Sequence, residues 1–211
     1  MRLYTFAAGL FTAIILVAHA IAPAPYSWTM HEMSQLGAQG YEYAYLMRFG
    51  LISYGALVVV AAILKVAKRF RTGWPNGFIG IYGFAILLTG FFSTAPFRPG
   101  VPFSFREMNL HSTFGSLAVF ALSTAMVAFT VMAQTPRGRI IHLVALVLIW
   151  LMPEIFLKFS DAAGVLQRLL WLVMIAWFTV LEIPSLQADF RQSLTLHPPN
   201  NSLKLTRRAG E

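Results

Sequence analysis

Long stretches without charge most constrain what this chain can fold into. No Lys, Arg, Asp or Glu lies between Arg2 and Glu32, or between Arg71 and Arg98. A helix needs about 20 consecutive apolar residues to cross the hydrocarbon core of a bilayer. Charged residues make up 11% of the sequence, whereas they make up roughly 25% of a typical soluble domain. The sequence therefore predicts an integral membrane protein.

Hydropathy predicts an all-α bundle of six transmembrane helices. A β-barrel is disfavoured, because the apolar runs are continuous and do not alternate with polar residues. Each predicted span has about 20 residues or more, enough for a core of about 30 Å. The expected spans are 3–23, 44–66, 76–96, 110–133, 139–159 and 163–186.

One transmembrane domain, residues 1–190, is expected, followed by a disordered basic cytoplasmic tail, residues 191–211. The first span follows Arg2 and ends near an Ala-His-Ala sequence, as a signal peptide does, but its apolar stretch is too long for one, so we expect it to be retained. The absence of Cys excludes disulfides, thiolate metal sites and a cysteine nucleophile.

The distribution of basic residues predicts the orientation of the spans. One set of span ends and the tail carry eleven Lys and Arg, and the opposite ends carry five, Arg48, Arg98, Arg106, Lys158 and Arg168. Because cytoplasmic segments are enriched in basic residues, both termini are predicted to be cytoplasmic in a prokaryotic inner membrane. This pattern explains the net charge of +8 without a nucleic-acid partner, and the expected partners are membrane lipids.

Small residues in the spans predict where helices approach each other closely. The candidates are Gly50 and Gly55 in the second span, Gly80 and Gly83 in the third, and Gly115 with Ser116 in the fourth.

Polar residues from separate segments are predicted to gather at the outer side of the bundle. Charged groups within a membrane are costly, and they tend to face a partner or a wet cavity. We expect an outward-facing pocket there, with Arg48, Arg168, Glu154, Ser34 and Arg106 as ligand-binding residues. By contrast, His142 is expected to be interfacial or solvated at the cytoplasmic side, and Glu182 is expected to have no role.

Several short signatures occur in a fixed order along the chain. They are His31–Gly37 after the first span, Leu46–Gly50, Phe92–Pro96, Asn109–Ser112 and Gly164–Arg168. In this set the chain resembles the DUF998 family of bacterial and archaeal membrane proteins over about residues 5–186. The resemblance implies a six-span helical fold and no established activity. Gln35 and Ala95–Phe97 stand where members of that family often carry an acidic residue.

Three hypotheses for function remain open. The first is a binding module that recognises a lipid head group or a small molecule at the polar cluster. The second is a hydrolase or transferase acting on a lipid, with His111 and His31 as catalytic residues and Ser34 or Ser112 as nucleophile. The third is a purely structural membrane subunit. No metal site is predicted, because no His-x-x-x-His or His-Glu-x-x-His sequence occurs, and the sequence identifies no cofactor.

Overall fold

The computed structural model describes residues 2–68 and 73–182. The regular secondary structure in these two ranges consists of helices. They are six α-helices and two short 3₁₀ helices: α1 (Leu3–Ala20), η1 (Met33–Gly37), α2 (Ala44–Lys68), α4 (Pro75–Phe91), α5 (Phe105–Met132), α6 (Pro136–Lys158), η2 (Ser160–Ala162) and α7 (Ala163–Leu181). The predicted all-α class is confirmed. The predicted tail, 191–211, lies outside the described residues.

Within the described ranges, five helices are long and apolar enough to cross a membrane: α1, α2, α5, α7 and residues 136–155 of α6. α4 is apolar but has 17 residues, so it extends about 25 Å, somewhat less than a hydrocarbon core of about 30 Å. It ends early because the backbone becomes extended at Phe92. Five of the six predicted spans are therefore confirmed, which indicates a multi-pass membrane protein.

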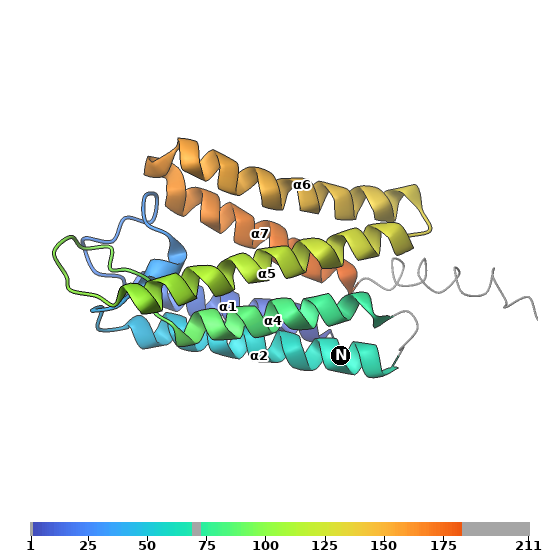
Figure 1. The fold of residues 1–211 in the computed structure, drawn as a ribbon, viewed down its shortest axis with the longest axis horizontal. Coiled ribbons are helices and arrows are strands. Elements are labelled where there is room, and N and C mark those ends of the chain that lie inside the picture. Colours follow the sequence, from blue (N-terminus) through green and yellow to red (C-terminus); the bar gives the residue numbers. More distant parts are fainter. Residues whose placement is uncertain (1, 69–72, 183–211) are drawn as a thin grey trace, which may run out of the picture.

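The six α-helices alternate in direction and pack in a ring (Figure 1). Each helix packs against the next along the chain, and α7 returns to contact α1. One end of the bundle, called the loop end here, carries segments 21–43, 92–104 and 159–162. The opposite end, called the terminal end, carries the start of α1 and the end of α7. The direction in which this bundle crosses a membrane stays a prediction.

α2 and α4 approach each other so closely that only glycine fits at their contact. A Cβ atom at Gly55 would lie 2.5 Å from the carbonyl oxygen of Gly83, and one at Gly90 would lie 2.9 Å from that of Arg48. The predicted role of Gly55 and Gly83 is thus confirmed. Gly115 differs from the prediction, because a Cβ there would have nothing within 4 Å: the residue lines a cavity instead.

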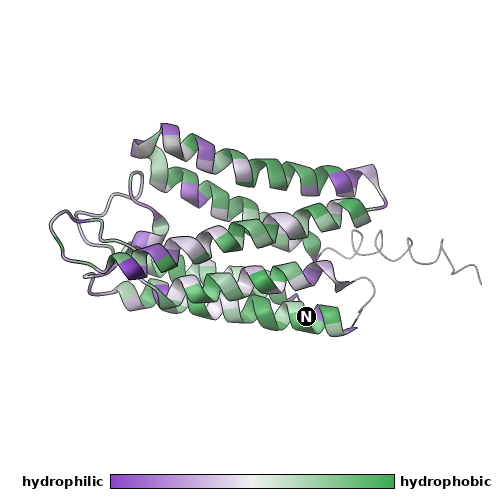
Figure 2. Ribbon diagram, in the orientation of Figure 1, coloured by the Kyte–Doolittle hydropathy of each residue, from purple (hydrophilic) through white to green (hydrophobic). Residues whose placement is uncertain are grey.

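Large apolar side chains cover the outside of the bundle. Val131 is 74% exposed, and Leu16, Phe49, Ile63, Phe120 and Val147 are among many others that are exposed. Figure 2 shows the apolar residues along the middle of the bundle and the polar ones concentrated toward its two ends. A soluble protein rarely exposes so continuous an apolar surface, whereas hydrocarbon chains of lipid would cover it favourably.

Candidate functional site

A cavity of about 420 Å³ lies inside the ring, on the side of the loop end. Its walls come from η1, α2, α4, α5 and α7, and Thr94 and Ala95 are added by the segment that follows α4. Small-molecule sites in proteins commonly have volumes of about 300–1,000 Å³. The cavity is therefore large enough for an organic ligand.

Polarity changes along the length of this cavity. The side chains near the starts of α5 and α7 and on η1 are polar except for Met108, and those one or more turns further into the membrane-spanning part are mainly apolar. The polar rim consists of Glu32, Ser34, Gln35, Thr89, Thr94, His111, Ser112, Ser116 and Gln167. The apolar floor consists of Met47, Leu51, Tyr82, Ile86, Val119, Leu170, Trp171 and Met174. The lining is thus amphipathic, with its polar part toward the loop end.

Glu32 anchors η1 to α7 at the rim. Its carboxylate accepts hydrogen bonds from the Ser34 hydroxyl at 3.1 Å and from the Gln167 amide at 3.2 Å. It also takes part in a capping box with Gln35, whose side chain accepts from the Glu32 backbone N–H at 3.0 Å. Ser34, predicted as a ligand-binding residue, lines the cavity, and its hydroxyl hydrogen is directed to this carboxylate.

His111 connects α5 to the end of α4. Its Nδ1 lies 3.0 Å from the Thr89 carbonyl oxygen and 2.9 Å from that of Phe92. A carbonyl oxygen only accepts hydrogen bonds, so Nδ1 must carry the proton and Nε2 of the neutral ring is an acceptor. Glu107, one turn earlier, accepts from the Ser93 backbone N–H at 3.1 Å, so both side chains hold the chain that leaves α4.

Arg168 lies beside the cavity, where it holds the first loop against α7. Its guanidinium donates to His19 Nε2 and the Tyr26 hydroxyl, both at 2.6 Å, and to the carbonyl oxygens of His31 and Gly164. The backbone N–H of Ser27 donates to His31 Nδ1 at 2.8 Å. Burial raises the pKa of Tyr26, and Arg168 only partly opposes this shift, so the hydroxyl stays neutral.

The remaining predicted site residues lie outside the cavity lining. Arg48 donates to the carbonyl oxygens of Gly90 at 3.2 Å and Phe91 at 2.7 Å, and so caps the C-terminus of α4. Arg106 and Glu154 are exposed. Among the predicted residues, the structure therefore brings His111 and Ser34 to one cavity. His31 and Arg168 lie beside this cavity, where Arg168 donates to the His31 carbonyl oxygen. Arg48, Arg106 and Glu154 do not line the cavity.

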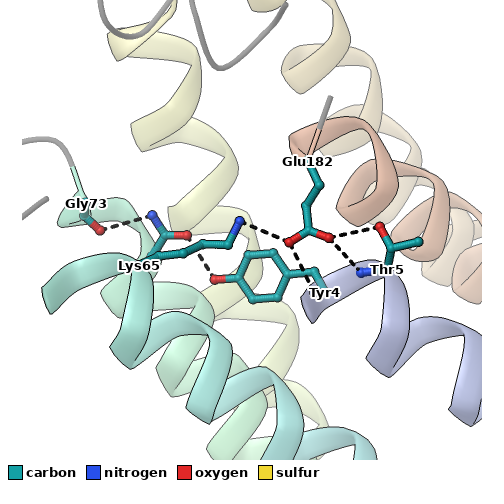
Figure 3. A network of polar contacts seen from close by, with 6 residues as sticks. Tyr4, Thr5, Lys65, Gly73 and Glu182 are labelled. Carbon is teal, nitrogen blue, oxygen red and sulfur yellow. Dashed lines mark hydrogen bonds and ion pairs between the residues drawn. The ribbon is translucent and has the colours of Figure 1, made fainter. Parts of the chain in front are cut away.

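The sequence interpretation missed a polar network at the terminal end (Figure 3). Glu182 was expected to have no role, but it is 4% exposed and forms an ion pair with Lys65 at 3.1 Å. Its carboxylate also accepts from the backbone N–H groups of Tyr4 and Thr5, and from the Thr5 hydroxyl at 2.9 Å. Glu182 thus caps the N-terminus of α1 from the end of α7.

Other members extend this network across the terminal end. The Tyr4 hydroxyl donates to the Asn76 side chain at 2.9 Å, and Asn76 donates to the Gly73 carbonyl oxygen at 3.1 Å (Figure 3). Lys65 Nζ lies 4.5 Å from the centre of the Tyr4 ring. An acidic residue inside the predicted span 163–186 was the available sequence signal, because a carboxylate within a membrane span needs a partner.

His142 also differs from its expected interfacial position. The ring is 3% exposed and its Nδ1 accepts from Trp177 Nε1 at 3.0 Å, so it joins α6 to α7 inside the bundle. Among the described residues, no three His, Cys, Asp or Glu side chains are grouped so as to hold a metal ion.

Comparison with known proteins identifies a family. The model of the family described as "Protein of unknown function (DUF998)" matches residues 5–183. No curated protein and no solved structure matches the chain. Because the family model covers most of the sequence, the chain belongs to the DUF998 family.

Proposed function

We propose that this protein binds an amphiphilic lipid in the cavity between α5 and α7. The lipid head group would lie at the polar rim, and a hydrocarbon chain would lie on the apolar floor. The observation that carries this proposal is the change of the cavity lining from polar to apolar along the bundle. A ligand of uniform polarity would leave one part of such a lining poorly matched.

The rim favours a head group that donates hydrogen bonds. Among the residues that the structure describes, Glu32 is the acidic residue of the lining and no Lys or Arg lines the cavity, while His111 Nε2 is an acceptor in the neutral ring. Arg48 and Arg168, which the sequence predicted as ligand-binding residues, are not needed for this proposal, because they donate to carbonyl oxygens and other neutral acceptors. A neutral polar or cationic head group is better matched to this rim than an anionic one.

Gly115→Leu provides a sharp test. A side chain there would point into open space, so it would fill the cavity without displacing packed atoms. Native mass spectrometry of the protein extracted in a mild detergent should find bound lipid on the wild type. In Gly115→Leu we expect the affinity for lipid to fall about tenfold, which corresponds to about 1.4 kcal/mol of lost binding energy, and the lipid-bound fraction to fall with it.

Gly9→Leu is the matched control. Gly9 also has nothing within 4 Å of a built Cβ atom, but it is exposed on α1 and does not line the cavity. Both changes replace a helical glycine by leucine, so they alter helix propensity in the same direction. Equal lipid retention by the two variants would overturn the proposal, as would a wild type that retains no lipid.

Catalysis on the bound lipid is the second candidate function. One observation favours it: His111 Nδ1 donates to carbonyl oxygens, so in the neutral ring Nε2 is the nitrogen that can accept a proton, as a general base does. Within residues 2–68 and 73–182, however, no serine hydroxyl hydrogen-bonds to a histidine ring, and His111 does not bond to His31 or Glu107. A time course of lipid extracts incubated with wild type and His111→Gln would detect a product that only the wild type forms.

We further propose that the terminal end faces the cytoplasm of a prokaryotic cell. The basic residues Lys65, Lys68, Arg137 and Arg139 at that end support this orientation. The chain has no Cys, so single-cysteine variants need no background mutations. An impermeant maleimide applied to intact cells should label Met30→Cys at the loop end and spare Gln134→Cys. The reverse labelling would invert the topology.

A further inference from the structure

A second pocket lies at the loop end, and none of its residues lines the cavity described above. Its volume is about 380 Å³, and its walls include Ile21, Tyr41, Glu42, Tyr43, Phe97 and Arg98. These residues come from the segment after α1, the segment before α2 and the segment after α4. We call this hollow the loop pocket.

Hydrogen bonds hold the three walls of the loop pocket in place. The Gln39 side-chain amide donates to the carbonyl oxygens of Ser93 at 3.3 Å and Ser104 at 3.1 Å, and its oxygen accepts from the Ser104 backbone N–H at 2.7 Å. The Tyr41 hydroxyl donates to the Ile21 carbonyl oxygen at 3.1 Å. A pocket held in this way needs little ordering when a ligand binds.

Gly40 adds to this close packing of the walls. Its φ angle is +73°, in the left-handed region that favours glycine, and a Cβ atom there would lie 2.8 Å from Val101 Cγ1. The segment before α2 therefore approaches the segment after α4 so closely that position 40 requires glycine, and this contact forms part of the pocket wall.

Three aromatic rings form much of the wall. The rings of Tyr41 and Tyr43 have centroids 6.0 Å apart at an angle of 81°, and those of Tyr41 and Phe97 are 6.0 Å apart at 69°. All three residues line the pocket, so their rings offer aromatic surface to a ligand there. An ammonium group over the face of such a ring is attracted to it by the cation–π interaction.

Two opposite charges share the pocket without pairing with each other. Glu42 and Arg98 are both exposed lining residues, and across the described part of the chain neither takes part in an ion pair. The Arg98 guanidinium carbon lies 5.8 Å from the centre of the Phe97 ring, which keeps the positive charge at one wall. Both charges are thus available to a ligand.

From this arrangement we propose that the loop pocket binds a zwitterionic ammonium–phosphate group, the head-group chemistry of ethanolamine and choline phospholipids. The ammonium group lies against Tyr41 and Tyr43 and is paired with Glu42. The phosphate accepts hydrogen bonds from Arg98, whose planar fork matches two phosphate oxygens. A ligand that carries both charges uses both walls, whereas a singly charged ligand uses one.

The test compares water-soluble probes by isothermal titration calorimetry on the protein in a maltoside detergent. Phosphoethanolamine and glycerophosphocholine carry both charges, glycerol 3-phosphate carries the anion alone, and ethanolamine carries the cation alone. We expect the zwitterions to bind about tenfold more tightly than either singly charged probe, the gain that one added cation–π or ion-pair contact commonly gives. Equal affinities for all four probes together with no preference among lipids, or no binding by any probe or lipid, would overturn the proposal.

A second arm identifies the source of the head group. Native mass spectrometry compares phosphatidylethanolamine and phosphatidylcholine with the anionic phosphatidylglycerol. A preference that appears with the lipids and is absent with the soluble probes supports a membrane lipid as the ligand. A preference of equal size in both arms supports a free solute, and no preference in either arm contradicts the inference.

Charge-removing variants then separate the two walls. Glu42→Gln should lower zwitterion affinity to that of glycerol 3-phosphate, and Arg98→Gln should lower it to that of ethanolamine. Tyr43→Leu should weaken glycerophosphocholine about fivefold through the lost cation–π contact. Glu154→Gln and Arg106→Gln are the controls, since both residues are exposed and line neither hollow. If the controls reduce binding as much as Glu42→Gln and Arg98→Gln do, the pocket is not the site.

Discussion

The two ends of the bundle use polar residues in opposite ways. At the terminal end, the Glu182 carboxylate is buried, and both of its oxygens are bonded to Lys65 or to the first turn of α1. At the loop end, Arg48 and Arg168 donate to carbonyl oxygens and neutral side chains, and the charges of Glu42 and Arg98 stay unpaired in the described ranges. The polar residues of the terminal end join α1, α2 and α7 to one another. Those of the loop end hold the segments that line the cavity and the loop pocket.

This difference teaches which polar groups to associate with function. A charge whose bonding capacity is filled by the fold contributes to stability and has little left for a ligand. A charge or acceptor that faces a hollow with unused capacity is available for recognition, as with His111 Nε2 and Glu42. The number of charged residues at an end of the bundle does not distinguish these cases.

The largest predicted effect comes from breaking the network at the terminal end. Glu182→Gln removes the partner of Lys65 and the charged acceptor for the α1 backbone. Breaking a buried ion pair by removing one partner costs about 3 kcal/mol. We expect a loss of this size in the free energy of unfolding, measured by titrating the protein in mixed micelles with sodium dodecyl sulfate.

Glu154→Gln is the control for this loss. It removes the same charge from an exposed position on α6 and should change stability by less than about 0.5 kcal/mol. If both variants lose equal stability, the closed network at the terminal end is not what stabilises the bundle, and the contrast between the two ends fails.

Acid should remove part of the same stabilisation. Burial raises the pKa of Glu182, but the Thr5 hydrogen bonds and Lys65 together outweigh it, so the net pKa lies below its ordinary value of 4.5. A group with a lowered pKa contributes stability that is full above the ordinary value and is lost as the pH falls through the folded value. The wild type should therefore lose stability below about pH 4.5.

The difference in stability between the wild type and Glu182→Gln isolates the titration of Glu182. Other carboxylates also protonate in acid, but they are present in Glu182→Gln as well. The stability of the wild type minus that of Glu182→Gln, followed from pH 7 to pH 3, should shrink as the pH falls. A difference that stays constant over this range would show that the Glu182 charge is not coupled to folding.

Hydropathy predicted most of the fold because each span must satisfy its own backbone within the membrane. The predicted 44–66 and 163–186 correspond to α2 and α7, and Ser104 caps α5 as its position before Phe105 allows. The early end of α4 at Phe91 was not predicted from hydropathy, since the uncharged stretch continues to Phe97, and it is the extended conformation of Phe92 that ends the helix.

The candidate site was only partly predictable, because a one-dimensional pattern gives the level of a residue in the membrane but not the direction of its side chain. His111 and Ser34 were predicted to lie at one level, and both line one cavity. Arg48 lies at the same level, yet it turns to the carbonyl oxygens at the end of α4. Glu182 was overlooked because its partners, Tyr4 and Lys65, are distant in sequence.

At the loop end, Arg168→Gln should have a smaller effect than Glu182→Gln. The arginine holds the 21–37 segment through His19, Tyr26 and the His31 carbonyl oxygen, and these acceptors lose a charged donor. We expect about 2 kcal/mol of lost stability, the value of a strong hydrogen bond to a charged group. Hydrogen–deuterium exchange should increase in residues 26–37 and stay unchanged in α2 beyond Val58.

The control for this change is Arg106→Gln, which removes an exposed arginine from the same end and should leave exchange unchanged throughout. Faster exchange spread over all helices of Arg168→Gln would contradict a local anchoring role, because it would mean that Arg168 supports the whole bundle.

The smallest predicted effect concerns Arg48, and it distinguishes helix capping from ligand binding. The guanidinium donates to the last carbonyl oxygens of α4, where a positive charge interacts favourably with the helix dipole. Arg48→Lys keeps the positive charge but loses the second nitrogen donor of the guanidinium, so we expect a stability loss of less than about 0.5 kcal/mol. Arg48→Gln also loses the charge, so we expect a loss of about 1 kcal/mol. Lipid retention in native mass spectrometry should stay at the wild-type level in both variants, because Arg48 lines neither hollow. A loss of lipid in Arg48→Gln at unchanged stability would instead place this arginine at the ligand, and would show that the loop end does not separate its capping residues from its recognition residues.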